Sequence, residues 1–384
     1  MNNVRILHVV NIYFVLPYFI GEQFKYFNSK GLIQHVICSP SEHLESYSTE
    51  MGFRYLETKI ERSFNPISDI ISTIKIINYI KKNKINIVVG HTPKGALLAM
   101  IAAFITRVPK RIYFRHGLVF ETMTGLMKWL MINLDRITAF CSNRVVCVSP
   151  SIFTESQKYK LNSIDKQLIL GKGTCGGIDA MNKFNPELIN NVKKSELKKK
   201  FNLTDDHFVI GFCGRLVKDK GIIELVESFL LTKQKYEKIK LMLVGDFEDR
   251  DRLPENVQKK IKNHPDIIIT GFIYSDIEYF YSLMNLFVLP SYREGFPTSV
   301  LEASAMKLPI LTTKVTGCID SIIPNVTGLF ISHSPRDISS KILDIIYSAE
   351  NSFLGFNGRR HVLENFDYRV IWPIIESELF HLDN

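Results

Sequence analysis

Two glutamates, Glu294 and Glu302, stand eight positions apart in a segment suited to binding a sugar-like ligand. Glu294 follows an apolar run, in a loop shaped by Gly-Phe-Pro, and Glu302 lies one to two turns into the helix expected next. The backbone N–H groups of Thr298 and Ser299 open that helix and favour an anion. One carboxylate can then reach a sugar hydroxyl while the other accepts hydrogen bonds from a ribose. The alternative, a surface glutamate beside an unrelated helix glutamate, fits this loop less well.

Two basic residues, Arg215 and Lys220, lie at a second turn between an expected strand and an expected helix. Gly211 and Gly214 end the strand, and the helix begins after Gly221. A rigid guanidinium and a mobile ammonium beside a helix N-terminus suit a diphosphate. The turn by itself fits two exposed basic side chains equally well.

A glycine-rich motif of dinucleotide-binding spacing is formed by Gly171, Gly173 and Gly176. Such a motif works only when a helix opens directly after it, because the N-terminus of that helix holds the pyrophosphate. The following residues, up to Asn185 and Pro186, leave no room for that helix. We therefore expect a loop near a domain junction, and no dehydrogenase.

An Asp-x-Asp spacing occurs at Asp249 and Asp251, and some sugar transferases hold a divalent metal with this motif. The two aspartates stand in a run of mixed charges, so we expect a solvated loop. We predict no metal site in this protein.

The composition is that of a folded globular protein, with 46% hydrophobic and 23% charged residues. No apolar run approaches the roughly 18–20 residues of a membrane span, and the start of the chain lacks the features of a signal peptide. We expect a cytoplasmic protein whose six cysteines are reduced packing thiols, since they form no CxxC pair.

The charge is divided unequally along the chain. Residues 1–200 hold 28 Lys and Arg against 14 Asp and Glu, a net charge of +14, whereas residues 201–384 hold 20 against 25, a net charge of −5. A basic half can serve nucleic acid, an anionic membrane or a phosphorylated substrate, or simply be a solvated lysine-rich surface. The basic residues are scattered and lack aromatic stacking platforms, so nucleic acid is not expected.

Strands and helices are expected to alternate twice, which is typical of parallel sheets covered on both faces. In the first half the expected strands are 4–10, 34–38, 85–89, 111–114, 145–148 and 168–170, and the expected helices are 20–29, 67–82, 96–105 and 126–140. In the second half the expected strands are 208–213, 240–244, 267–270, 286–289, 310–312 and 329–331, and the expected helices are 222–231, 257–262, 277–284 and 299–306. The lysine-rich segment 193–200 between the halves is a linker or an exposed helix.

The fold class is thus α/β, with two Rossmann-like domains facing an interdomain cleft and ligand sites at the carboxyl ends of the strands. We expect an N-terminal domain over 1–181, a C-terminal domain over 182–365, and a last helix, about 366–384, that rejoins the first domain.

Segment 290–306, with the turn that holds Arg215 and Lys220, resembles the donor-site signature of the retaining family 4 glycosyltransferases of GT-B fold. Shorter matches, which extend the resemblance over nearly the whole chain, are Gly271-Phe-Ile, Gly317-Cys-Ile-Asp320, Asn325-Val-Thr-Gly328, His91-Thr-Pro-Lys94-Gly, Arg115-His116-Gly117 and Val148-Ser-Pro-Ser. The first half is similar to bacterial members that build capsule, O-antigen, lipopolysaccharide or glycoprotein glycans.

The resemblance implies a donor site in the C-terminal domain. Arg215 and Lys220 would neutralise the donor diphosphate, Glu302 would bind the ribose, and Glu294 would face the sugar ring as a catalytic residue. The remaining implied contacts are backbone pairing of Phe272 and Ile273 with the base, expected to be uracil, and the amides of Thr298 and Ser299 on the sugar or distal phosphate.

The N-terminal domain would bind the acceptor. His116 would cross the cleft to a sugar hydroxyl as the second catalytic residue, and its place in an exposed His-Gly argues against burial. Lys94 would contact acceptor phosphates. Many relatives have a Gly-Gly loop after the first strand, but this chain has only Gly21, behind an aromatic stretch from Tyr13 to Phe19 that could meet an acceptor's sugar or lipid.

The implied reaction is metal-independent transfer of an N-acetylhexosamine or related hexose from a UDP-sugar to a polyprenyl-diphosphate-linked saccharide, with retention. The basic half and the apolar helix at 126–132 would associate the enzyme with the anionic inner membrane face, although that helix could equally be a core helix. Two other functions remain open at this point: a sugar-nucleotide epimerase of the same fold and a non-catalytic nucleotide-binding module.

Overall fold

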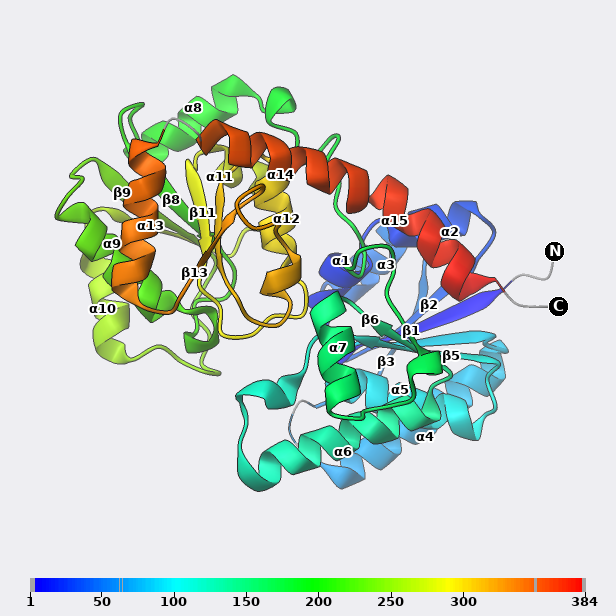
Figure 1. The fold of residues 1–384 in the computed structure, drawn as a ribbon. Coiled ribbons are helices and arrows are strands. Elements are labelled where there is room, and N and C mark those ends of the chain that lie inside the picture. Colours follow the sequence, from blue (N-terminus) through cyan, green and yellow to red (C-terminus); the bar gives the residue numbers. More distant parts are fainter. Residues whose placement is uncertain (1–3, 62, 64, 349–350, 382–384) are drawn as a thin grey trace. The chain divides into compact units, whose positions relative to one another are not determined.

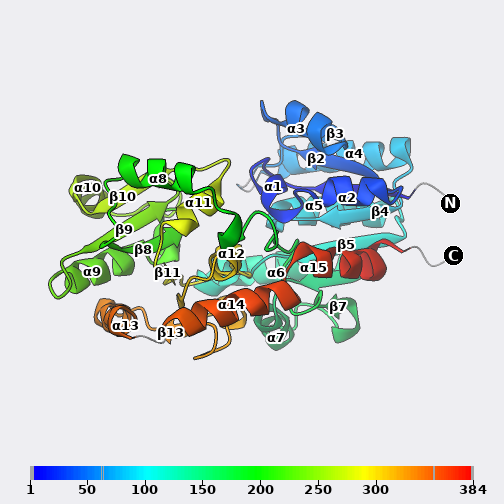
Figure 2. The ribbon, with the colours of Figure 1, turned by 90° about the horizontal axis from the view of Figure 1, so that it is seen from above.

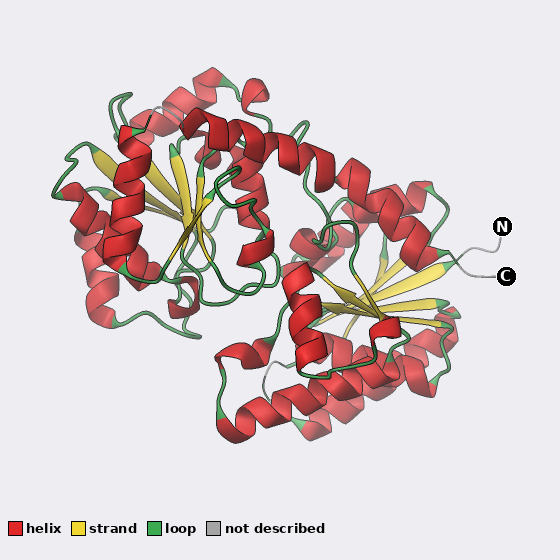
Figure 3. Ribbon diagram, viewed as in Figure 1, coloured by secondary structure: helices red, strands yellow, loops and turns green. Residues whose placement is uncertain are grey.

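The computed structural model describes residues 4–61, 63, 65–348 and 351–381. The chain forms two compact units, unit 1 (Met1–Gly177 with Arg369–Asn384) and unit 2 (Ile178–Tyr368) (Figure 1). Each unit has a parallel sheet with helices on both faces (Figure 3), so the expected α/β fold is confirmed.

Unit 1 contains a seven-stranded parallel sheet in the order β3-β2-β1-β4-β5-β6-β7. The strands are β1 (Arg5–Val9), β2 (Ile33–Cys38), β3 (Arg54–Glu57), β4 (Ile87–Gly90), β5 (Lys110–Arg115), β6 (Arg144–Cys147) and β7 (Gln167–Leu168). The central strands are continuous apolar runs because both faces of the sheet are covered.

Helices cover both faces of this sheet. They are α1 (Val15–Phe19), α2 (Gln23–Ser29), α3 (Leu44–Met51), α4 (Pro66–Asn83), α5 (Pro93–Ile105), α6 (Gly125–Cys141) and α7 (Pro150–Lys158). On one face, α5 packs between α4 and α6 (Figure 1). The chain returns to unit 1 at its end, through α15 (Tyr368–Ile375) and a π-helical turn (Glu376–Phe380), where Trp372 Nε1 donates to Gly176 O at 2.7 Å.

Unit 2 contains a six-stranded parallel sheet in the order β10-β9-β8-β11-β12-β13. The strands are β8 (Phe208–Cys213), β9 (Ile239–Val244), β10 (Ile267–Gly271), β11 (Leu286–Leu289), β12 (Ile310–Thr313) and β13 (Leu329–Ile331). The helices are α8 (Asn191–Lys200), α9 (Ile222–Lys233), α10 (Glu255–Asn263), α11 (Ile277–Ser282), α12 (Thr298–Ala305), α13 (Pro335–Tyr347) and α14 (Asn351–Asn365). Helix α9 packs on α13, and α12 packs on α14, as the view from above shows (Figure 2).

The structure contains several elements that the sequence analysis did not predict. The aromatic stretch after β1 contains the short helix α1, and α3, β3, α7, α13 and α14 were not expected. The lysine-rich segment is the helix α8, whose first N–H groups are capped by the side chain of Asn190. The glycine-rich motif at 171–176 is a loop with no helix after it, as expected, and it ends at the boundary between the units.

Candidate active site

The turn after β8 places Arg215 and Lys220 at the carboxyl edge of the unit 2 sheet. Lys220 ends a short 3-10 turn (Lys218–Lys220), and α9 starts at the next residue but one. Gly221 between them has φ +68°, and a Cβ there would lie 2.1 Å from the carbonyl oxygen of Pro290. Only glycine fits that position, so the turn after β8 packs directly on the loop after β11.

Glu294 lies in that second loop and forms an ion pair with Lys220 through Oε1. Both side chains are largely buried, with 11% and 17% of their surfaces exposed. The same Oε1 accepts a hydrogen bond from Ser291 Oγ at 2.7 Å, and the Glu294 backbone N–H donates to Thr316 O at 3.3 Å. Two contacts, from Lys220 and Ser291, therefore hold the carboxylate, and the backbone contact with Thr316 holds the residue itself in place.

The two loops are joined by further contacts. Arg293 Nη2 lies 2.7 Å from Asp219 Oδ2, and the backbone N–H of Tyr292 donates to Asp219 O at 2.9 Å. The ring of Tyr292 stacks on His333 with centroids 3.8 Å apart. These contacts fix the loop of Glu294 against the turn of Lys220, which is the kind of positioning a reaction centre needs.

Glu302 lies in α12 and accepts a hydrogen bond from the hydroxyl of Tyr281 through Oε2, at 2.7 Å. Tyr281 is fully buried and comes from the end of α11. Burial raises the pKa of Glu302, and the hydrogen bond from Tyr281 acts in the opposite direction.

Helix α12 begins at Thr298, with Pro297 in the N-cap position and no side-chain cap. An α-helix leaves the N–H groups of its first turn without intrahelical partners, so those of Thr298 and Ser299 suit an acceptor ligand. At the end of β10, Phe272 and Ile273 are half-buried, and the ring of Phe272 packs edge-to-face on the exposed Tyr274, with centroids 4.5 Å apart.

The Asp-x-Asp loop is exposed over residues 249–252, as expected, and it also contacts the turn of Arg215 and Lys220. Asp251 Oδ2 accepts the backbone N–H of Asp219 at 2.6 Å, and Glu248 Oε2 lies 3.0 Å from Arg215 Nη1. This loop therefore supports the turn of Arg215 and Lys220. Within the described ranges, no three His, Cys, Asp or Glu side chains are grouped so that they could hold a metal ion.

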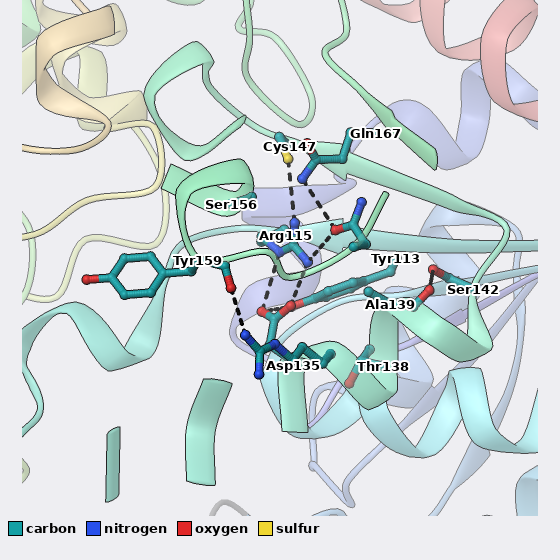
Figure 4. Close-up of polar contacts among 12 residues, drawn as sticks. Tyr113, Arg115, Asp135, Thr138, Ala139, Ser142, Cys147, Ser156, Tyr159 and Gln167 are labelled. Atoms are coloured by element: carbon teal, nitrogen blue, oxygen red, sulfur yellow. Dashed lines mark hydrogen bonds and ion pairs between the residues drawn. The ribbon is translucent and has the colours of Figure 1, made fainter. Parts of the chain in front are cut away.

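In unit 1, β5 ends at a fully buried arginine, Arg115, one residue before His116 (Figure 4). Arg115 Nη2 lies 2.6 Å from Asp135 Oδ1 of α6, and Asp135 Oδ2 also accepts from the hydroxyl of Tyr113 at 2.9 Å. Arg115 also donates to Asn162 Oδ1 at 3.1 Å. Because side chains alternate along a strand, Tyr113 and Arg115 face α6 and His116 faces the other side.

His116 is half-buried, contrary to the expected exposure. Its ring stacks on Phe19 of α1 with centroids 3.8 Å apart, and its Nε2 lies 3.0 Å from Nδ1 of His91. Burial lowers the pKa of His116 to about 3, so the ring is neutral at physiological pH. Of the two ring nitrogens of His116, Nε2 is the one in contact with His91.

The two acceptor candidates of unit 1 have structural roles as well. Lys94, in the first turn of α5, forms an ion pair with Asp69 of α4 at 2.7 Å and donates to Ser63 O at 2.6 Å. Gly21 has φ +55°, and a Cβ there would lie 2.8 Å from Pro17 O, so the turn that closes α1 requires glycine.

The structure thus places Arg215, Lys220 and Glu294 on loops after strands of unit 2 and Thr298, Ser299 and Glu302 in the helix α12, with Lys220 and Glu294 in direct contact. The sequence interpretation gave no role to Tyr281 or Ser291, and it named His91 only as part of a motif. The position of Ser291 three residues before Glu294 was the available signal. Tyr281 lies beside apolar residues and has the pattern of a core residue.

Comparisons with known proteins agree with this geometry. Residues 5–144 match the family model described as glycosyl transferase 4-like, and residues 193–352 match the one described as glycosyl transferases group 1. Over 380 residues the chain is 33% identical to the capsular polysaccharide biosynthesis glycosyltransferase CapM of Staphylococcus aureus, which covers 98% of this chain and 97% of CapM.

Two other proteins extend the comparison. The chain is 26% identical over 329 residues to the UDP-Gal:alpha-D-GlcNAc-diphosphoundecaprenol alpha-1,3-galactosyltransferase of Escherichia coli, covering 81% of each. The fold of this chain matches that of Anabaena HepE, which was solved in complex with UDP and glucose. The TM-score is 0.82 at 16% sequence identity, and the match covers 99% of this chain and 100% of HepE. The chain therefore belongs to the group 1 glycosyltransferases, the retaining family 4 enzymes with the GT-B fold, as its motifs indicated.

Proposed function

We propose that this enzyme transfers an N-acetylhexosamine or related hexose from a UDP-sugar to a hydroxyl of a polyprenyl-diphosphate-linked saccharide, with retention, during capsule or O-antigen assembly. The observation that supports the donor assignment is the ion pair between Lys220 and Glu294, the residues that we assign to the donor phosphate and to the sugar ring. The acceptor class is suggested by the diphosphoundecaprenol substrate in the name of the Escherichia coli relative.

The departing diphosphate would be stabilised by fixed positive groups of unit 2. When the anomeric bond breaks, negative charge grows on the phosphate oxygens and positive charge on the sugar ring. Arg215 is a fixed fork, and Lys220 has three N–H donors, so it can keep Glu294 and still reach a phosphate oxygen. The first N–H groups of α12 add their partial charge. Preorganised groups of this kind act as metal ions do in other transferases.

Glu294 would stabilise the positive charge on the ring, and Glu302 would hold the ribose. We assign the base to the backbone of Phe272 and Ile273. In the family's front-face mechanism the anomeric carbon breaks its bond to the donor phosphate oxygen and forms one to the acceptor oxygen on the same face. The acceptor proton passes to the phosphate oxygen that leaves, and UDP is released. His116 would contribute a hydrogen bond to a substrate hydroxyl.

Unit 1 would bind the anionic acceptor. Lys94 stands in the first turn of α5, where the helix dipole favours phosphate. The aromatic stretch before Gly21 includes Phe14 and Tyr18, whose rings pack together at 4.9 Å and are 38% and 45% exposed. Such a pair suits the apolar face of a sugar or a lipid chain.

The enzyme would also attach to an anionic membrane through unit 1. The helices α4 and α6 flank α5 and carry several exposed apolar side chains. The exposed fractions are 74% for Ile67, 61% for Ile70, 79% for Leu126 and 62% for Trp129. No helix of the part of the chain that the structure describes is long and apolar enough to cross a bilayer. A surface of this kind, in the half with net charge +14, suits the headgroup region of an anionic membrane.

The proposal is tested by incubating the full-length enzyme with a panel of UDP-sugars and a lipid-linked saccharide in the presence of EDTA. One UDP-sugar should give a lengthened, α-configured product and UDP. Glu294→Gln should lower kcat about a hundredfold or more, the scale of removing one preorganised charge, while UDP still binds. Unchanged turnover in Glu294→Gln would refute the assigned role of Glu294, and conversion of donor without acceptor would indicate epimerisation.

A further inference from the structure

Three histidines stand at the carboxyl ends of three neighbouring strands of unit 1. His8 lies in β1, His91 directly follows β4, and His116 directly follows β5. His8 Nδ1 lies 3.1 Å from His91 Nε2, and His91 Nδ1 lies 3.0 Å from His116 Nε2. The three rings are nearly parallel, with successive centroids 5.4 and 5.3 Å apart. They form one continuous chain of hydrogen bonds.

The hydrogen-bond chain of the three histidines ends, on the side of His8, at the side-chain amide of Gln34. Gln34 Oε1 of β2 lies 3.2 Å from His8 Nε2. With the Gln34 amide in this orientation, its carbonyl oxygen can only accept, so a neutral His8 donates from Nε2 and its Nδ1 carries no proton. His91 must then donate from Nε2 to His8, and His116 must donate from Nε2 to His91. One orientation of one amide therefore sets the tautomer of all three rings.

Burial keeps the three imidazole rings neutral, which the assigned direction of the hydrogen bonds requires. It lowers the pKa of His8 to about 4 and that of His116 to about 3, and the pKa of His91, between them, lies well below its usual value. Phe24 and Phe380 pack edge-on around His8, and Phe19 covers one face of His116. A neutral imidazole has one donor and one acceptor, so no ring in the chain can donate from both nitrogens.

We propose that His8 and His91 are positioning residues that fix His116 as a hydrogen-bond acceptor at Nδ1, selecting a substrate hydroxyl and rejecting a carboxylate or phosphate at that position. The inference rests on the proposed contact of His116 with substrate and deepens it. A neutral nitrogen without a proton can receive an O–H, whereas an anionic oxygen brought to it would face a lone pair. The three histidines thus contribute to sugar specificity, because the position of the proton on each ring leaves Nδ1 of His116 as an acceptor.

The direct test is the protonation state of the three rings in the full-length enzyme. Imidazole nitrogens labelled with ¹⁵N distinguish bare from protonated positions by NMR, and single substitutions at His8, His91 and His116 assign the signals. At neutral pH all three rings should be protonated at Nε2 and bare at Nδ1. A proton on Nδ1 of His116, or a cationic ring, would overturn the proposal. This readout needs no sugar substrate, so it is independent of the proposed transfer reaction.

A substitution series then tests whether the chain acts on catalysis. His91→Phe keeps a flat ring but breaks the chain, and it should lower kcat roughly tenfold, the factor of about one net hydrogen bond, without changing UDP affinity. His91→Gln, which can donate and accept at once, should recover part of the loss. The matched control is His35→Phe: His35 is also buried and neutral, with its pKa lowered to about 4, but its Nδ1 contacts the Tyr79 hydroxyl on the other side of β2.

The outcomes of that series are distinct. A loss of kcat in His91→Phe with partial recovery in His91→Gln and none of the loss in His35→Phe supports the proposal. Equal losses in His91→Phe and His35→Phe would mean a general effect on unit 1 stability, and unchanged kcat in His91→Phe would show that the chain does not position His116. Either result overturns the inference.

Discussion

Lys220 and Glu294, 74 residues apart in the chain, form an ion pair between two loops at the carboxyl edge of the unit 2 sheet. Ser291 holds the same carboxylate oxygen as Lys220, and Arg293 ties the loop to Asp219, next to Lys220. The cation proposed for the donor phosphate and the anion proposed for the sugar ring are therefore fixed relative to each other. A substitution at either residue should therefore affect the binding of both the donor diphosphate and the donor sugar.

Lys220→Ala should lower kcat/KM about a hundredfold to a thousandfold, because it removes a phosphate-binding charge and the partner of a largely buried carboxylate. Donor titrations in the transferase assay measure this effect. Lys218→Ala is the matched control, since Lys218 lies in the same turn and is exposed. Equal activities of the two variants would contradict the role given to Lys220.

Glu302→Gln should weaken UDP binding about tenfold but raise stability near neutral pH. Burial raises the pKa of Glu302 in the folded protein, so the folded state binds its proton more tightly than the unfolded chain does. The charged carboxylate of Glu302 therefore lowers the free energy of unfolding by its full amount at pH values above its pKa in the folded state. This destabilisation disappears as the pH falls to the pKa of Glu302 in the unfolded chain. Urea unfolding at several pH values should show that the stability gain of the variant shrinks with falling pH. A gain that grows instead would contradict the assignment.

Arg115→Met should destabilise unit 1 by about 3–5 kcal/mol, since it leaves Asp135 with no guanidinium in a buried network. Adding Asp135→Leu should recover much of this loss, because the uncompensated charge is then gone. Denaturant unfolding measures both, with Arg144→Ala, at an exposed position of β6, as the control. A double variant less stable than Arg115→Met would show that the network has another role.

Replacing Ile70 and Trp129 together by serine should reduce binding to vesicles that contain anionic lipid, measured by sedimentation at low salt, because both exposed apolar side chains would insert at the membrane surface. Val192→Ser is the control; Val192 is 68% exposed but lies in α8 of unit 2, not in α4 or α6. If the wild-type protein does not bind such vesicles, the membrane proposal fails.

The sequence was sufficient to predict the two-sheet fold, and it placed Arg215, Lys220 and Glu294 in turns that follow strands, because these segments alternate at short, regular spacings. Lys220 and Glu294 were each recognisable from their own segment, but their ion pair depends on Gly221 packing against Pro290. That contact joins segments about 70 residues apart, and no local pattern contains it.

Other features could not be predicted from local patterns. The isoleucines of α4 predict a helix through their spacing, but spacing does not tell which of them a neighbouring element covers. Ile76 and Ile80 are buried, whereas Ile67, Ile70, Ile71 and Ile74 stay exposed. His8 reads as an interior strand residue, and only the order β2-β1-β4-β5 of the sheet brings it beside His91 and Gln34. Helices such as α3 and α7 are short and polar, so their periodic signal is weak.

The measurement that tests the donor site most directly is the melting temperature of the full-length protein with UDP, GDP, ADP and CMP, each with and without EDTA. A ligand that binds only the folded state raises the melting temperature by mass action. We predict that UDP raises it, that EDTA leaves the shift unchanged, and that Lys220→Ala reduces the shift. No shift with any of the four nucleotides would contradict the donor site proposed for unit 2.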